Sequence, residues 1–392
     1  MKYFKPVAQA LPAKAAATLF LLCGLLVVSG CDAGRETTAN DAGFAGLGAA
    51  SEGYTQAHAG MSLNFPADDG PHTGFRIEWW YLTANLEDER GEPLGLQWTL
   101  FRQAQQPVNT ATPDGPWAAQ QIWMAHMALS RGEQHRVAER FARGTDVVRA
   151  DHQAGVIAKP FRAWLDNWQL ESLGTTEDAL DRLQLSAEAK DGQGDFGYEL
   201  TLEASGPLVR HGIKGFSQKS ANGQGSMYYS QPFYRASGRV WLNGESVSVN
   251  GEAWLEREWS SQLLSKKQSG WDWFSLHLNS GHKLMAFRLR GGGDNHSDYL
   301  SGSWISPDGE VMPLSAESIT LTPLKNAGVA GRHVPVHWRL TLPEQQLTLS
   351  VSAHHPNRWM HTSVPYWEGA VSVTDADSGA PLGRGYLEMT GY

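Results

Sequence analysis

Beyond residue 60 the chain is dominated by alternation of apolar and polar residues with a period of two. The stretch "RIEWWYLTANL" is followed by the polar turn "EDERGEP" and then by "LGLQWTLFRQ", which is the pattern of two antiparallel strands joined by a hairpin. Asn-Gly and Asp-Gly pairs, which favour two-residue hairpin turns, separate later segments of the same kind. The pattern predicts an all-β fold of many antiparallel strands, closed into barrels or packed as sandwiches.

The N-terminal stretch follows a different pattern. Three lysines precede the apolar run "AAATLFLLCGLLVVSG", which is shorter than a comfortable membrane span and ends in small residues. The sequence "VSGC" resembles the lipobox of bacterial lipoproteins, in which the cysteine is lipidated and becomes the new N-terminus. We therefore expect residues 1–30 to be a signal peptide and Cys31 to anchor a periplasmic lipoprotein to a membrane. The alternative is an ordinary secretory signal with an incidental cysteine.

The residues after this cysteine bear on location and partners. Asp32 resembles the signal that retains enterobacterial lipoproteins at the inner membrane, with the outer membrane as the alternative. Residues 31–60 are small, polar and rich in Gly and Ala, which is typical of a flexible tether. The net charge of −9 argues against nucleic acid as a partner, because phosphate binding requires a basic surface. Cys23 would leave with the signal peptide, so the mature chain is expected to have no disulfide.

The chain is rich in aromatic residues, with 16 Trp, 13 Phe and 11 Tyr. Some of these rings must pack in cores, but so many also suggest a cavity lined by aromatic side chains. A site for an apolar ligand would bury Trp inside a barrel, whereas a carbohydrate-binding site would expose Trp on one face. The pattern leaves both alternatives open.

Common catalytic motifs are absent from the chain. It contains no H-E-x-x-H, G-x-S-x-G, P-loop or dinucleotide-binding motif, and we expect no cofactor and no metal. His354, His355 and His361 could ligate a metal, but their spacing matches no established site. Exposed loop histidines are the simpler interpretation.

Three acidic residues stand among large aromatic residues. Glu78 directly precedes the run "WWY", and Glu258 directly precedes a tryptophan in "GEAWLEREWSSQ". Asp272 lies between two tryptophans in "SGWDWFSLHL", at the head of an otherwise apolar strand face. Burial on such a face would raise the pKa of an acid and suit it to act as a general acid. The alternative is that each acid pairs with an arginine, such as Arg76, or caps a turn.

Six stretches spread from about residue 70 to the C-terminus resemble one known family. They are "HTGFRIEWWYLTANL", "WMAHMALS", "KSANGQGSMYYSQP", "GEAWLEREWSS", "GWDWFSLHLNSGHKLMAFRLR" and "GRGYLEMTGY". The family is that of the AttH proteins and carotenoid 1,2-hydratases, also described as secreted hydrolases. The resemblance implies two tandem lipocalin-like antiparallel β-barrels, which we assign to residues 61–240 and 241–392.

The resemblance also implies a pocket framed by these motifs. In the hydratase branch an aspartate beside aromatic rings protonates an alkene and water then adds to the cation, without a cofactor. The position most similar to that acid is Asp272, with Glu78 and Glu258 as further candidate acid–base groups. The implied ligand-binding residues are Trp79, Tyr81, His126, Tyr229, Trp259, Trp271 and Trp273. The chain departs from the hydratases where it has "WLEREWS" in place of a histidine-rich segment, which weakens a transfer of carotenoid hydratase activity.

Two principal functions remain open from the sequence, and we rank the first above the second. The first is a membrane-anchored binding protein that holds an apolar lipid or terpenoid-like molecule in a barrel and serves a membrane transporter, such as ABC transporter components. The second is a cofactor-independent hydratase or hydrolase that acts on an apolar substrate through buried carboxyl groups. The enzyme hypothesis requires a carboxyl group of raised pKa that faces a cavity. A structural or adhesive role is a third alternative, for which the sequence offers no chemistry.

Overall fold

The computed structural model describes residues 51–108, 119–145, 148–174, 179–265, 268–292 and 297–392. Within these ranges the regular elements are antiparallel β-strands and one short 3-10 helix, η3 (Ala67–Asp69). The all-β prediction is therefore confirmed. The same ranges hold no helix with the length and hydropathy that a membrane crossing requires. The signal peptide, the lipidation at Cys31 and most of the tether lie outside the described residues and stay predictions.

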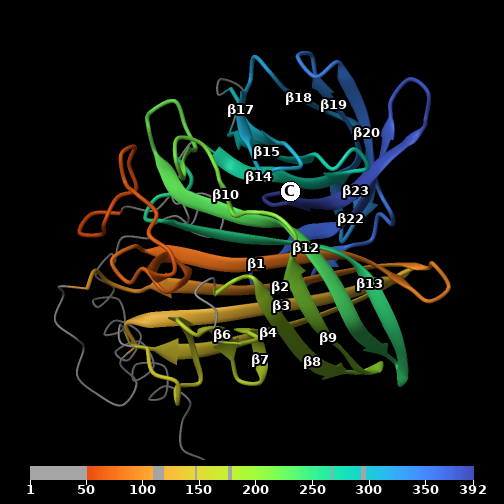
Figure 1. Cartoon of the computed structure of the whole chain (residues 1–392). Helices are drawn as coiled ribbons and strands as arrows, with labels where there is room; N and C mark the ends of the chain where they lie inside the picture. Colours follow the sequence, from red (N-terminus) through yellow and green to blue (C-terminus); the bar gives the residue numbers. More distant parts are fainter. Residues whose placement is uncertain (1–50, 109–118, 146–147, 175–178, 266–267, 293–296) are drawn as a thin grey trace, which may run out of the picture. The chain divides into compact units, whose positions relative to one another are not determined.

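The first sheet curls into a nearly closed barrel (Figure 1). Its strand order is β4 (Gln134–Gly144), β3 (Gln121–Arg131), β2 (Pro93–Ala104), β1 (Ile77–Asp88), β13 (Glu245–Ser260), β12 (Gly225–Leu242), β9 (Gly194–Ala204), β8 (Arg182–Asp191), β7 (Trp168–Ser172), β6 (Phe161–Leu165) and β5 (Ala154–Ala158). Two short strands, β10 (Val209–Arg210) and β11 (Phe216–Gln218), also pair with β12.

The second sheet forms a half-barrel. Its strand order is β17 (Val311–Ser315), β16 (Tyr299–Ile305), β15 (Lys283–Gly291), β14 (Gln268–Leu278), β23 (Pro381–Met389), β22 (Tyr366–Asp375), β20 (Leu347–Ala353), β19 (Arg332–Leu342) and β18 (Thr320–Val329). The short strand β21 (Trp359–Met360) pairs with β22. Both sheets begin with a four-strand meander, β1 to β4 and β14 to β17, so the two halves of the chain repeat one topology.

The change from one sheet to the other falls between Ser260 and Gln268. The sequence placed the boundary near residue 240, which would separate β12 from β13. These two strands pair with each other from Met227 to Leu242, and β13 also pairs with β1 along its length. Residues 241–260 therefore belong to the N-terminal sheet. Apolar alternation marks a strand but does not show with which neighbour the strand pairs.

Each sheet encloses its own hydrophobic core. The side chains of Trp80, Trp98 and Trp168 fill the first core, and those of Trp338 and Trp367 fill the second. Packed side chains thus occupy the interior of each sheet. One of the alternatives left open by the sequence had placed an apolar ligand there. A third group of buried residues comes from both sheets and packs between them, where β1 contacts β23 and β2 contacts β22.

Candidate functional site

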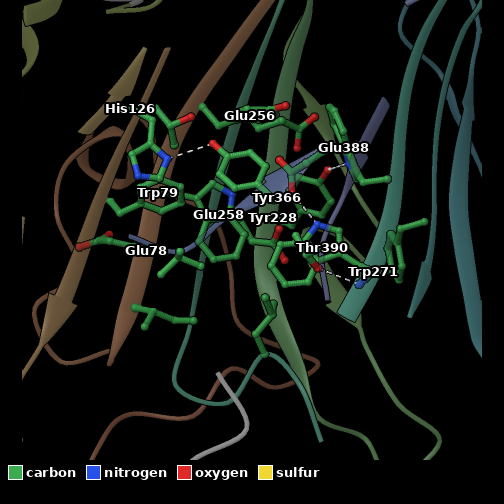
Figure 2. A pocket seen from close by; sticks show the side chains of 18 of the residues that line it. Glu78, Trp79, His126, Tyr228, Glu256, Glu258, Trp271, Tyr366, Glu388 and Thr390 are labelled. Carbon is green, nitrogen blue, oxygen red and sulfur yellow. Dashed lines mark hydrogen bonds between the residues drawn. The ribbon is translucent and has the colours of Figure 1, made fainter. Parts of the chain in front are cut away.

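A cavity of about 170 Å³ lies between the two sheets. Strands β1, β2, β3, β12 and β13 form one wall, and β14, β15, β22 and β23 form the other. A cavity of roughly 150 Å³ can hold a molecule of the size of benzene, so this space admits at least one small apolar group. Titratable and aromatic side chains of the lining include Glu256, Glu258, Glu388, Tyr228, His126 and Trp271, which Figure 2 labels. Lys219 and Trp273 also line the pocket.

Strand alternation explains how the sequence supplies this wall. On β1, Trp80 points into the first core, whereas Trp79 and Tyr81 face the pocket. Opposite them on β13, Glu258 pairs with Trp79 and Glu256 pairs with Tyr81 in the antiparallel register. The pocket wall is therefore built from the outer faces of strands whose inner faces form the core of the first barrel.

Glu78 is held by arginines at the margin of this pocket. Its side chain is 0% exposed, and it forms ion pairs with Arg102 and, at 2.5 Å, with Arg257. His72 donates its backbone N–H to the Glu78 carboxylate at 2.9 Å. Burial alone raises the pKa of Glu78, but Arg102 and Arg257 outweigh it and hold that pKa well below its ordinary value. Glu78 thus orders the first barrel and is no source of protons.

Asp272 faces away from the pocket. It is 0% exposed and points with Phe274 toward the second core. Its oxygen Oδ2 lies 2.8 Å from Arg288, and Oδ1 lies 2.6 Å from Arg290 and accepts a hydrogen bond of 2.7 Å from the Tyr392 hydroxyl. Both oxygens are therefore engaged. This geometry is contrary to the general-acid role that the sequence indicated for Asp272.

Glu258, the third predicted acid, does line the pocket. Lys219 places its Nζ 2.9 Å from Oε1 of Glu258, and Ser226 donates a hydrogen bond to the same oxygen. The Lys219 ammonium also lies 4.1 Å from the centre of the Phe287 ring. Glu258 is therefore an ion-paired carboxylate in the wall of the pocket.

Glu256 is a second pocket carboxyl and has no cationic partner in the described contacts. Ser230 donates to its Oε1 at 2.8 Å, Trp254 donates its indole N–H to the same oxygen, and Tyr228 forms a further hydrogen bond. Burial raises the pKa of Glu256 to about 8, and the neighbouring Glu258 contributes in the same direction. Glu256 is therefore mainly protonated at neutral pH.

Glu388 is a third pocket carboxyl, contributed by the C-terminal strand. Trp271 donates its indole N–H to Oε1 of Glu388 at 2.5 Å, and Tyr81 also hydrogen-bonds to this carboxyl. Burial raises the pKa of Glu388 to about 7, while these hydrogen bonds act in the opposite direction. The side chain is only half-buried, so it can meet a molecule in the pocket. A pKa near the working pH is the condition for efficient proton transfer.

Sequence reasoning missed Glu256 and Glu388 as acids for a physical reason. In "GRGYLEM" the residue Glu388 alternates with apolar neighbours, which is the ordinary pattern of a strand with one solvated face. Only the packing of the first sheet on that face turns a solvated glutamate into a half-buried acid. Strand alternation did place Glu256 on the same face as Glu258. The two glutamates differ because Lys219 pairs with Glu258 only, and Lys219 comes from a distant segment of the chain.

Five of the predicted ligand-binding residues line the pocket and two do not. Those in the pocket are Trp79, Tyr81, His126, Trp271 and Trp273. Trp259 instead points into the first barrel and stacks on His72 with a ring separation of 3.8 Å. Tyr229 also belongs to that core and donates a hydrogen bond of 2.6 Å to Asp69. Among the described residues, no group of three or more His, Cys, Asp or Glu side chains is arranged to hold a metal ion.

The two paired β-sheets with a pocket between them define a protein of the lipocalin-like class. Comparison with known families then identifies the family. The sequence model of the AttH-like family matches residues 56–392. The chain therefore belongs to the AttH-like family. A comparison with curated proteins finds no match.

Solved structures share this architecture. A protein assigned as AttH from Nitrosomonas europaea is 33% identical, with a TM-score of 0.73 over 86% of this chain and 99% of that one. Kievitone hydratase from Nectria haematococca is 15% identical, with a TM-score of 0.59 over 86% of this chain and 97% of that one. CghA, solved with Sch210972, is 12% identical, with a TM-score of 0.52 over 86% of this chain and 94% of that one. The last two likenesses establish the fold alone.

Proposed function

We propose that this protein is a cofactor-independent hydratase that adds water to a carbon–carbon double bond of an apolar substrate. The observation that carries this proposal is Glu388, a half-buried carboxyl with a pKa of about 7 on the wall of an aromatic pocket. The enzyme hypothesis required such a group. The candidates chosen from the sequence do not provide it, since Glu78 and Asp272 are paired with arginines.

The proposed reaction uses four side chains of the pocket. The O–H bond of Glu388 breaks as its proton forms a C–H bond with one alkene carbon, and the other carbon becomes cationic. The rings of Trp271 and Trp273 stabilise this cation through their negative faces. Water then adds to the cation, and its proton passes to the carboxylate of Glu258. The product is the alcohol, and the same residues catalyse the reverse dehydration.

The test is incubation of the soluble mature protein with an apolar extract of bacterial membranes in water labelled with oxygen-18. We expect mass spectrometry to detect a product that has gained one labelled water, and we expect Glu388→Gln to abolish it. The matched control is Asp151→Asn, which makes the same change of charge at an exposed ion pair and should leave product formation unaltered. Labelled product from Glu388→Gln at the rate of the unmodified protein would refute the proposal.

A second candidate function is binding and transfer of an apolar ligand without chemistry. The apolar and aromatic lining of the pocket favours it, and a lipid anchor at Cys31 would place such a carrier at a membrane beside a transporter. Native mass spectrometry of protein purified from the periplasm distinguishes the two functions. An unmodified ligand that co-purifies equally with the Glu388→Gln variant supports binding alone, whereas accumulation of an unsaturated compound only in that variant supports the hydratase.

A further inference from the structure

A continuous series of hydrogen-bonding groups leads from Glu388 away from the pocket. Tyr81 hydrogen-bonds to Glu388, and its hydroxyl oxygen also lies 2.5 Å from Oε1 of Glu368. Tyr366 also hydrogen-bonds to Glu368. The Tyr366 hydroxyl lies 3.0 Å from Nδ1 of His126, a contact drawn in Figure 2.

The series ends at a carboxylate that reaches solvent. The other ring nitrogen of His126, Nε2, lies 3.0 Å from Oε1 of Glu139. His126 is 1% exposed in its side chain, whereas Glu139 is 18% exposed. Glu139 is fixed by Ser363, which donates its hydroxyl to Oε2 at 2.8 Å and its backbone N–H to both oxygens. The two ends of the series therefore lie in the pocket and at the surface.

The interior members have few other partners. Glu368 is buried, and its Oε2 has no hydrogen-bond partner among the described residues. Burial and the neighbouring Glu388 raise the pKa of Glu368 well above its ordinary value, which favours the protonated form. Burial lowers the pKa of His126 although Glu139 acts against it, so the imidazole rests in its neutral form and can accept a proton at one nitrogen while it releases one from the other.

We propose that Tyr81, Glu368, Tyr366, His126 and Glu139 form a proton relay that reloads Glu388 from solvent. This inference rests on the proposed function, in which Glu388 loses its proton to the substrate and Glu258 takes the proton of water. After that step the Glu388 carboxylate accepts the hydroxyl proton of Tyr81. Glu368 reprotonates Tyr81, Tyr366 reprotonates Glu368, and His126 reprotonates Tyr366 from Nδ1. Glu139 passes a proton from solvent to Nε2, so one proton enters at the surface for each proton that Glu388 loses. Glu258 releases to solvent the proton that it took from water, so both carboxyl groups regain their starting states and the cycle consumes no proton.

The arrangement across the two sheets supports this role. Tyr81, His126 and Glu139 belong to the first sheet, on β1, β3 and β4, whereas Glu368 and Tyr366 belong to β22 of the second. Counted from Glu388 on β23, the series crosses the interface between the sheets three times. Neither sheet needs these contacts between the sheets for its own strand pairing or for its own core.

The test measures protonation of Glu388 without any substrate. A rapid drop in pH is applied to the protein, and infrared spectroscopy follows the carboxylic C=O band that is absent from Glu388→Gln. We expect His126→Phe and Tyr366→Phe, which keep an aromatic ring but cannot pass a proton, to slow the growth of this band by about tenfold or more. The equilibrium titration of the band should remain in both variants, which shows that the pocket is intact.

His277→Phe is the matched control, because His277 is also a buried histidine but binds the backbone oxygen of Pro232 at 3.1 Å. It should leave the rate unchanged. Imidazole added to a His126→Ala variant should restore part of the lost rate. Unchanged rates in both His126→Phe and Tyr366→Phe would overturn the relay and show that Glu388 exchanges through the mouth of the pocket. A missing hydration product together with slowed variants would refute the hydratase and retain the relay.

Discussion

Glu78 and Asp272 occupy equivalent positions in the two sheets. Each is fully buried on the first strand of a meander and lies opposite an arginine of the next strand, Glu78 opposite Arg102 and Asp272 opposite Arg288. Each carboxylate also binds a second arginine. The acids that stand out most clearly in the sequence are therefore paired internal charges of the two barrels, and the acids to which we assign the proposed reaction lie on the strand faces that line the pocket.

Neutralising either internal acid should destabilise the fold. Glu78→Gln leaves two buried guanidinium groups without their carboxylate, and Asp272→Asn leaves two half-buried ones. We expect each substitution to cost about 3–5 kcal/mol in the free energy of unfolding. Urea denaturation followed by tryptophan fluorescence measures this loss. Asp151→Asn at an exposed pair should change stability little. A Glu78→Gln variant as stable as the unmodified protein would contradict the structural role.

Glu78 should also govern part of the stability at acidic pH. Its pKa in the folded chain lies well below the ordinary value of 4.5, so the unfolded chain binds its proton first. The stabilisation from Glu78 is complete when the pH is above the ordinary pKa of 4.5, and it is lost progressively as the pH falls below that value. Stability of the unmodified protein should therefore decline more steeply with acid than that of Glu78→Gln. Parallel declines in urea titrations at a series of acidic pH values would contradict this.

Glu256 should make the protein less stable as the pH rises. Its pKa is about 8 in the folded chain and near 4.5 when exposed, so the folded state binds the extra proton between these two values. Stability from this group is complete below the lower value and declines until the pH exceeds the higher one. Glu256→Gln, which resembles the protonated form, should remove this decline. The measurement is the urea denaturation midpoint of the unmodified protein and of Glu256→Gln at pH values across this range. An equal decline of the midpoint with pH in both proteins would contradict a protonated Glu256.

The indole of Trp271 should tune Glu388. Its N–H stabilises the carboxylate form, so Trp271→Phe should raise the pKa of Glu388 above its present value of about 7, by about one pH unit. Carbon-13 NMR of labelled glutamate carboxyls measures the titration, with Glu388→Gln to assign the signal. Trp304→Phe, outside the pocket lining, serves as the control. An unchanged titration of Glu388 in Trp271→Phe would contradict the predicted effect of this hydrogen bond on its pKa.

Gly95 should be required for the close approach of the two sheets. A Cβ atom at this position would lie 2.8 Å from the Tyr386 hydroxyl oxygen and 3.1 Å from Cβ of Ala370. We expect Gly95→Ala to cost about 1–3 kcal/mol in the free energy of unfolding, because the packed interface must shift. Gly192→Ala is the matched control, since a Cβ there meets no atom within 4 Å. Equal stability of the two variants would show that the sheets separate without cost.

The sequence by itself determined the elements of the fold. Period-two alternation and hairpin dipeptides predicted antiparallel strands, and the motifs around Glu78 and Asp272 identified the family and its paired lipocalin-like sheets. It also identified Glu258 and five ligand-binding candidates of the pocket, among them Trp79 and Trp273. These results follow because strand alternation is a local property that neighbouring residues encode.

Only the tertiary structure decided which face of each strand became the site. The boundary between the sheets moved past Ser260 because strand pairing depends on residues far apart in the chain. The acidic residues also differ in their partners, which lie on other strands or segments of the chain. Arg102 and Arg288 bind the conspicuous carboxylates, Lys219 binds Glu258, and the first sheet covers Glu388. A carboxyl group holds or loses its proton according to the charges and the solvent around it. For Glu78, Glu258 and Asp272 these surroundings form when strands pair within a sheet, and for Glu388 they form when the two sheets pack together.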